Sequence, residues 1–355
     1  MPLRQMEKNM GKYILKRLGY MFVVLIILSF LLFLIYNLVP SNRAYTDANE
    51  QVKTMKHLTP EESKAKFNEL YKEYQIKYGT DTNNKLVRYL RWVGVMPNAK
   101  GDYIGLLQGN FGYSYQEKDD VVNVIPAPMK NTVIINIFST ILALGITIPL
   151  GILCAVKKGS RGDKFVGVFT IIGYSLPVFL IAILFIWLFC SKLHWFPPSG
   201  MKTLGVNLEG WAYIKDRAYY LALPLITMTF CSLGSMTRYV RASMIDALSL
   251  DCIKTARAKG VREKVVIFSH AFRNALIPIV TLVIGWFLSI FSGSLMIEQM
   301  FGLNGMGDLM ITSLRTSDFD VIMILQVFYV TIALLGNLII DIAYGLVDPR
   351  VRVNK

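Results

Sequence analysis

Residues of the kinds that catalyse reactions or bind metals are sparse and scattered along this chain. The three histidines, His57, His194 and His270, are far apart, and neither they nor the four cysteines have the spacing of metal ligands. The stretch 159–164, GSRGDK, has the letters of a phosphate-binding loop but lacks the spacing Gly-x-x-x-x-Gly-Lys-[Ser/Thr]. We therefore expect no metal site, no cofactor and no enzymatic activity in this chain.

The most specific pattern lies in the stretch 251–278, which is too basic to cross a bilayer. Helical spacing predicts two short helices joined at Gly260, because glycine reaches positive φ without steric cost. Each predicted helix has one apolar face, formed by Ala247, Leu250, Ile253 and Ala256 in the first and by Val265, Val266, Phe268, Ala271, Phe272 and Ala275 in the second. Such a helix–turn–helix can dock into a cleft on a soluble partner.

A second group of residues offers hydrogen bonds without fixed charge within or beside apolar segments. Its members are Thr132, Asn136, Ser139, Ser175, Ser289 and Ser292. The first three recur at four- and three-residue spacing, which places them on one helical face. They could line a path for a polar solute or join neighbouring helices, since small polar residues also do the latter in membranes. The sequence leaves both interpretations open.

Long apolar segments must position these residues. Of the 355 residues, 54% are hydrophobic, and runs of about 20 apolar residues are long enough to cross a hydrocarbon core. We predict an all-α membrane protein with six transmembrane helices, at 20–39, 133–156, 166–189, 219–237, 279–297 and 321–347. Pro177 should break the third of these segments, because proline removes a backbone hydrogen bond.

The distribution of charge predicts the orientation. With both termini inside, the cytoplasmic parts (1–19, 157–165, 238–278 and 348–355) hold 20 Lys and Arg against 6 Asp and Glu. The parts outside hold 18 against 17, so the net charge of +14 follows from topology. We therefore expect a multi-pass plasma-membrane protein in contact with lipid, with cytoplasmic N- and C-termini and no nucleic-acid partner.

The predicted external segment, 40–130, is too long for a simple connector and must have structure of its own. Thr59-Pro60-Glu61-Glu62 forms a capping box with proline at the first helical position, and the helix should end at Gly79. A second amphipathic helix is predicted from about Asn83 to Val95. The segment could form a helical cap over an outer mouth, or a solvated loop tied down by its aromatic residues.

The stretches TARAKG (255–260) and HAFRNA (270–275) together resemble the cytoplasmic coupling loop of ABC importer permeases. The match is to the variant found in the first permease subunit of the peptide/nickel family, although Cys252 stands where an aromatic residue is common. Further stretches are similar to the same family outside an insertion at 96–102. These are LVRYLRW (86–92), GNFGYSY (109–115), SLPVF (175–179), FPPSG (196–200), EQMFGLNGMG (298–307) and DPR (348–350).

The resemblance implies a type I ABC importer permease with an extended external segment between helices 1 and 2. The core, 131–347, would contain the coupling loop, 238–278, and form half of a translocation path. Its partners would be a homologous second permease subunit, two subunits that bind ATP and Mg, and an external substrate-binding protein. The residues expected to couple the chain to the ATPase are Thr255, Ala256, Arg257, Lys259, Gly260 and Arg262.

The substrate and the energy source each leave an alternative. Peptides are the expected substrate, and the same family also imports nickel chelates, glutathione or haem. An ion-coupled secondary transporter is the alternative from another class, and Asp341, a carboxylate within the last span, is its main support. Such transporters usually contain internal repeats, and we find none between 20–190 and 219–347. The coupling loop favours the importer.

Overall fold

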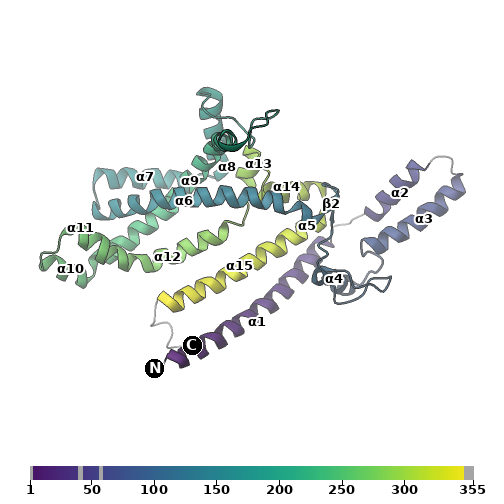
Figure 1. The fold of residues 1–355 in the computed structure, drawn as a ribbon, viewed down its shortest axis with the longest axis horizontal. Helices are drawn as coiled ribbons and strands as arrows, with labels where there is room; N and C mark the ends of the chain where they lie inside the picture. Colours follow the sequence, from purple (N-terminus) through teal and green to yellow (C-terminus); the bar gives the residue numbers. More distant parts are fainter. Residues whose placement is uncertain (1–2, 39–42, 56–58, 348–355) are drawn as a thin grey trace. The chain divides into compact units, whose positions relative to one another are not determined.

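The computed structural model describes residues 3–38, 43–55 and 59–347, so the predicted tail, 348–355, lies outside the described part. The described chain is mostly helical, with one two-stranded sheet (Figure 1). It divides into two compact units. Unit 1 contains 1–124 and 313–331, and unit 2 contains 125–312 and 332–355. Each unit is described by itself below.

Within the described residues, four helices are long and apolar enough to cross a membrane. They are Tyr13–Tyr36 within α1 (Leu3–Tyr36), Val121–Val156 through α5 (Val121–Val124) and α6 (Pro126–Val156), α9 (Gly210–Ser249), and Phe319–Ile342 within α15 (Phe319–Val347). Two bent helix pairs raise the number to six if each pair counts as one span. Each of the six predicted segments overlaps one of these elements.

The third predicted segment is broken at Pro177, as expected. It consists of α7 (Arg161–Ser175), then α8 (Val178–Phe185) continuing as the π-helix η2 (Ile186–Lys192), and the two parts meet at 105°. Leu176 and Pro177 between them have extended backbone conformations, with ψ of 137° and 138°. Proline has no N–H to donate and disfavours the helical conformation of the residue before it, so the helix cannot continue.

The predicted fifth span, 279–297, is wrong at its C-terminal end. The chain passes from α11 (Glu263–Val265) and the π-helix η3 (Val266–Ala271) into α12 (Phe272–Ser289), which ends eight residues early. After a turn, Leu295–Phe301 forms the separate helix α13, and Met306–Thr316 forms α14. Glycine at position 293 permits this turn, because a Cβ there would lie 2.2 Å from the backbone nitrogen of Gly307.

Unit 2 has its core where α6, α7, α9 and α12 lie side by side (Figure 1). One apolar cluster joins α6, α9, α10 (Asp251–Ala258), η3 and α12, and includes Met244, Ile253 and Val266, all fully buried. A second cluster joins α6, α8, α9 and α13 around Leu223 and Ile297. Together these clusters hold α6, α9 and α12, three of the helices around the candidate site.

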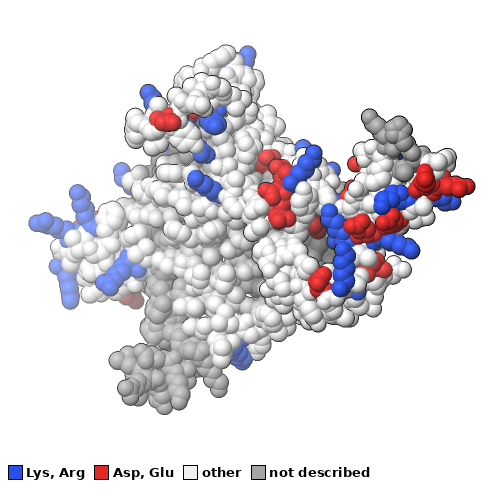
Figure 2. Space-filling view, turned by 45° about the vertical axis from the view of Figure 1, so that its right-hand side comes forward, with Lys and Arg blue, Asp and Glu red and all other residues white. Residues whose placement is uncertain are grey.

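Unit 1 contains most of the predicted external segment, 40–130. The predicted capping box is present: Thr59 accepts from the backbone N–H of Glu62, and α3 (Pro60–Lys77) follows. The helix α2 (Arg43–Thr54), which the sequence analysis did not predict, packs against α3 through Ala48 and Val52. Figure 2 shows basic and acidic side chains mixed over this hairpin.

The rest of the predicted external segment has short and irregular elements. The second predicted helix is α4 (Lys85–Val93), with Asn84 as its N-cap and Gly94 as its left-handed C-cap. After the 3-10 helix η1 (Leu106–Gln108), β1 (Tyr113–Ser114) pairs with β2 (Asp119–Asp120) in antiparallel orientation. Asp318 holds this hairpin by accepting from the hydroxyl of Ser114 at 2.7 Å and from the backbone N–H of Tyr115 at 3.0 Å.

Candidate functional site

A cavity of about 450 Å³ lies in unit 2 between α6, α7, α9 and α12. None of the residues that line it is charged. Its polar wall is formed by Asn136, Ser139, Thr140, Tyr174, Cys231, Ser232, Ser235 and Ser289. The remaining wall is apolar or small, and includes Met228 and Trp286. Such a cavity can offer hydrogen bonds to a polar solute without binding it through fixed charge.

Three of the residues predicted to line a path meet in this cavity: Asn136, Ser139 and Ser289. Asn136 and Ser139 are nearly buried, at 8% and 5% exposed, whereas Ser289 is exposed. Asn136 donates from its amide nitrogen to the carbonyl oxygens of Ile290 at 2.9 Å and Ser292 at 3.0 Å. Asn136 therefore joins α6 to the end of α12 and also lines the cavity. Its surroundings fit both interpretations, lining a path and joining helices.

The other three predicted path residues do not line the cavity. Ser175 is exposed at the end of α7, and Ser292 is exposed in the turn after α12. Thr132 is fully buried, and its hydroxyl donates to Glu298 at 2.8 Å and accepts from the backbone N–H of Met306 at 2.8 Å. Thr132 therefore joins α6 to α13 and to the start of α14.

Glu298 is the centre of a polar cluster that the sequence analysis missed. The carboxylate is 2% exposed and accepts from Thr132, from the backbone N–H groups of Ser294 and Gly307, at 3.2 Å and 2.6 Å, and from that of Asp308. Burial raises the pKa of Glu298, while these hydrogen bonds oppose the rise. The cluster joins α13 and the start of α14 to α6, about one helical turn before the residues of α6 that line the cavity.

The predicted coupling loop is the second candidate functional feature of unit 2. The helix α10 ends at Ala258, and Gly260 follows with φ of +74° and open space around its α-carbon. Ile253 is fully buried and Ala256 is half-buried against the core, so one side of α10 is anchored. Among the coupling residues, Thr255, Arg257, Lys259, Gly260 and Arg262 are exposed. Figure 2 shows basic side chains gathered over this end of the unit.

One of these basic residues already has an acidic partner within the chain. Arg257 donates to Glu263 through Nη2 at 2.7 Å and through Nε at 3.2 Å, which closes the turn around Gly260. The pair is about half exposed on each side. The side chains of Lys259 and Arg262 make no hydrogen bond or ion pair with the other described residues, so they are the cations available to a partner.

The second apolar face predicted for the coupling loop is partly wrong. Val266, Ala271 and Ala275 are buried as expected, but Val265 and Phe268 are 41% and 56% exposed. Phe268 lies within the π-helix η3, whose wider turn changes the angular spacing of its residues relative to an α-helix. Val265 precedes η3, at the end of the short helix α11. Leu250 also interrupts the first predicted face, because its extended backbone (ψ of 144°) separates α9 from α10.

An ion pair connects the turn between α6 and α7 to α9. Arg241 donates from Nε and Nη2 to the two carboxylate oxygens of Asp163, at 2.6 Å and 2.8 Å. Asp163 also accepts from the backbone N–H of Gly159 at 2.8 Å. The carboxylate side chain is only 7% exposed. The pair therefore fixes the turn between α6 and α7 to the part of α9 that leads into the coupling loop.

Comparison with known proteins gives a consistent result. Residues 147–353 match the family described as "binding-protein-dependent transport system inner membrane component". The oligopeptide transport system permease protein AppB of Bacillus subtilis is 37% identical over 78% of this chain and 83% of its own length. The dipeptide transport system permease protein DppB of Lactococcus lactis is 30% identical over 97% of this chain and 100% of its own.

A solved structure of the MetNI methionine ABC transporter, in an inward-facing conformation, also matches. It covers 62% of this chain and 97% of its own, with a TM-score of 0.48 and 15% sequence identity.

Proposed function

Because this chain belongs to the family of inner membrane components of binding-protein-dependent transport systems, we propose that it forms half of the translocation path of an ATP-driven peptide importer. Peptide as the substrate class is supported by the names of its relatives, which are oligopeptide and dipeptide permeases. Nickel chelates, glutathione and haem are the alternative substrates, and no feature of the cavity favours them. ATP and Mg would bind to partner subunits, not to this chain.

The observation that carries the proposal is the coupling loop. A short helix that is anchored on one side by Ile253 and exposed on the other can fit a cleft on an ATPase subunit. The turn at Gly260 reverses the chain at a φ of +74°, which glycine adopts without the strain that other residues incur. Lys259 and Arg262 would meet acidic groups of the partner, while Arg257 keeps the turn closed through Glu263.

The complete transporter would contain a homologous second permease subunit, two ATPase subunits and an external binding protein. The charge asymmetry supports an orientation with both termini and the coupling loop in the cytoplasm. The cavity would open toward the second permease subunit, so that substrate passes between the two. A neutral, weakly binding lining suits a transporter that must accept varied side chains and then release them.

Gly260→Val tests the coupling role in the assembled importer in proteoliposomes. A β-branched residue at φ of +74° is strained, so the turn should open and the docking of α10 should weaken. ATP-driven peptide uptake should fall at least tenfold, while the permease still inserts and binds its permease partner.

Gly205→Val is the matched control. Gly205 also has a positive φ, +77°, and open space around it, but it lies in the loop before α9, far along the chain from the predicted coupling loop. Uptake by this variant should stay within about threefold of the unmodified protein. Equal uptake by the Gly260→Val variant and the unmodified importer would contradict the proposed coupling.

A further inference from the structure

The helix α4, in unit 1, is amphipathic and packs against the membrane-spanning helix α1. Tyr89 is 6% exposed, and its ring meets Phe30 and Phe33 of α1 edge-on, at 5.0 Å and 5.6 Å between centroids. The hydroxyl of Tyr89 forms a hydrogen bond with that of Ser29 at 2.7 Å and donates to the carbonyl of Ile26 at 3.3 Å.

These contacts fix the depth of α4 relative to the bilayer. The apolar stretch of α1 ends at Tyr36, and Ser29 lies seven residues before it. At a rise of about 1.5 Å per residue, Ser29 lies roughly 10 Å inside the end of this stretch. A side chain of α4 that reaches Ser29 therefore places α4 beside the outermost turns of a lipid-exposed helix, at the level of the headgroups and the upper acyl chains.

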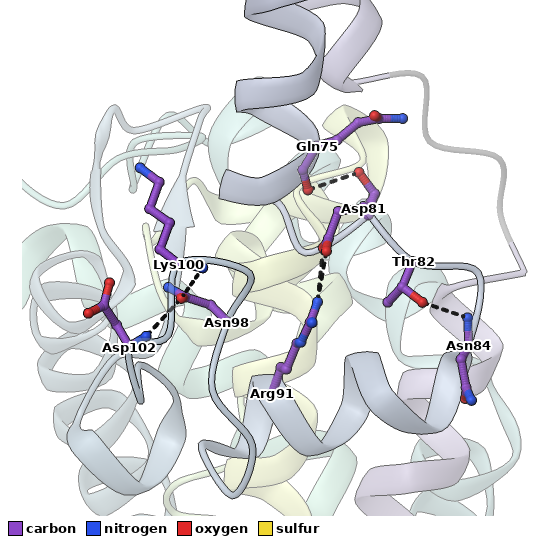
Figure 3. Close-up of polar contacts among 9 residues, drawn as sticks. Gln75, Asp81, Thr82, Asn84, Arg91, Asn98, Lys100 and Asp102 are labelled. Atoms are coloured by element: carbon purple, nitrogen blue, oxygen red, sulfur yellow. Dashed lines mark hydrogen bonds and ion pairs between the residues drawn. The ribbon is translucent and has the colours of Figure 1, made fainter.

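The loop that follows α4 is held in a defined shape. Gly94 and Gly105 approach so closely that a Cβ on Gly105 would lie 2.4 Å from the Gly94 nitrogen, and Gln108 donates to the Gly94 carbonyl at 3.1 Å. Within the loop, the side-chain oxygen of Asn98 accepts from the backbone N–H groups of Lys100 and Asp102 (Figure 3). This loop is folded, so the exposure of its side chains is a property of its structure.

The segment 85–108, formed by α4 and this loop, exposes many large apolar side chains for a stretch of its length. They are Leu86 (53% exposed), Val95 (54%), Tyr103 (58%), Ile104 (49%) and Leu107 (71%). Exposed apolar groups at this density mark a binding surface or contact with a membrane. Their exposure in water would oppose the hydrophobic effect.

The cations of α4 are not equivalent. Arg91 donates through Nη1 to both carboxylate oxygens of Asp81, at 3.1 Å and 2.9 Å (Figure 3). The side chain of Arg88, one turn earlier, makes no hydrogen bond or ion pair with the other described residues, although it lies within the field of the Asp81 carboxylate. The Nε atoms of both arginines are buried. Lys85 lies three residues before Arg88, on the neighbouring turn of the same side. Arg88 and Lys85 can therefore receive an anion from outside the protein.

We propose that the segment 85–108 is an anchor in the leaflet at the C-terminal end of α1, which is the outer leaflet in the orientation proposed above. Leu86, Ile104 and Leu107 would enter the boundary between headgroups and acyl chains. Arg88 and Lys85 would bind the phosphate of an anionic phospholipid. Tyr and Trp side chains are typical of this depth, and Tyr103 and Trp92 supply them here.

Two features favour lipid over a protein as the occupant. The segment packs against α1, whose apolar stretch is only 11% buried within the chain and is long and apolar enough to cross a membrane. Protein interfaces are depleted of charge at their centre, whereas α4 combines two free cations with apolar residues in the pattern of an interfacial helix.

The position of Leu107 tests the anchor directly. In a Cys252→Ser background, Leu107→Cys is labelled with an environment-sensitive fluorophore in the importer assembled in nanodiscs, and Lys64→Cys, exposed on α3, is the aqueous reference. We expect quenching by spin-labelled lipid at 107 and by aqueous iodide at 64. Quenching by iodide at 107, or protection from both quenchers by a protein subunit, would overturn the proposal. The readout needs no transport, so it is independent of the proposed function.

The phosphate contact is tested by the retention of phosphatidylglycerol by the purified permease, measured by mass spectrometry. Arg88→Gln should lower retention about fivefold relative to phosphatidylcholine, the factor expected from about 1 kcal/mol per cation at an anionic membrane surface. Arg91→Gln, which removes a cation already paired with Asp81, should change retention less than twofold. An unchanged value for Arg88→Gln, or an equal loss in both variants, would contradict a specific role for Arg88.

Discussion

The side-chain amide of Asn136 donates a hydrogen bond of 2.9 Å to the backbone carbonyl of Ile290, 154 residues further along the chain. The last carbonyls of a helix have no partner within the helix itself. Asn136 satisfies those at the end of α12 and thereby holds this end against α6, where both helices line the cavity. Its role in the path is therefore inseparable from its role in helix packing.

Asn136→Leu should destabilise the protein. The substitution removes the donor and leaves the buried carbonyl of Ile290 without a partner, which typically costs about 1–3 kcal/mol. We expect a lower Tm in detergent, followed by tryptophan fluorescence. Asn131→Leu is the control, because Asn131 donates to a single exposed carbonyl, that of Asn304, from the same helix. An equal fall of Tm in both variants would argue against helix capping by Asn136.

Local structure could be predicted from the sequence wherever short-range physics decides it. The capping box at Thr59, the break at Pro177 and the turn at Gly260 each depend on the covalent properties of one or a few neighbouring residues. The helix α2 also left a signal, since Ala44, Ala48 and Val52 recur every four residues and are buried. Small side chains make this stripe weak, and α2 was missed for that reason.

The candidate site depended on contacts between distant residues. Thr132 and Glu298 are 166 positions apart, and no periodicity indicates that the buried carboxylate would receive the hydroxyl. The π-helix η3 likewise has no local signal, yet it turns Phe268 to the surface. Sequence spacing placed Asn136 and Ser139 on one face correctly, but only the tertiary packing separates them from Thr132.

Glu298→Gln should lower the stability of the outer part of unit 2. Each carboxylate oxygen of Glu298 accepts two hydrogen bonds, and glutamine would replace one acceptor by an NH₂ group that faces two donors. Buried donors without an acceptor cost about 1–3 kcal/mol each, so Tm should fall clearly. Glu209→Gln, at an exposed position, should leave Tm unchanged. If both variants unfold like the original protein, the hydrogen-bond cluster has no role in stability.

The ion pair between Asp163 and Arg241 should behave as a coupled unit. Arg241→Met leaves a carboxylate that is 7% exposed without its partner, which should cost about 3 kcal/mol. Combining it with Asp163→Asn removes the unpaired charge and should recover more than half of the lost stability, measured by chemical denaturation in detergent. Additive losses in the double variant would show that the two side chains do not interact energetically.

The cavity provides a test of the path that does not disturb packing. Ser289 is exposed, lines the cavity, and its hydroxyl donates only to the carbonyl of Trp286 within its own helix. Leucine at this position would add apolar volume to the cavity without removing a contact between helices. A change in transport can then be separated from a change in stability, which Asn136 does not allow.

Ser289→Leu should therefore slow peptide uptake at least threefold while Tm and ATPase docking stay unchanged. The physical reason is twofold: the side chain narrows the cavity and replaces a hydrogen-bonding group that a solute would meet. Ser292→Leu is the matched control. Ser292 is also an exposed serine and lies three residues further along the chain, but it does not line the cavity. Uptake is measured with labelled dipeptide in proteoliposomes at equal amounts of assembled importer. If the two variants transport equally well, substrate does not pass this cavity and the path lies along another face of the subunit.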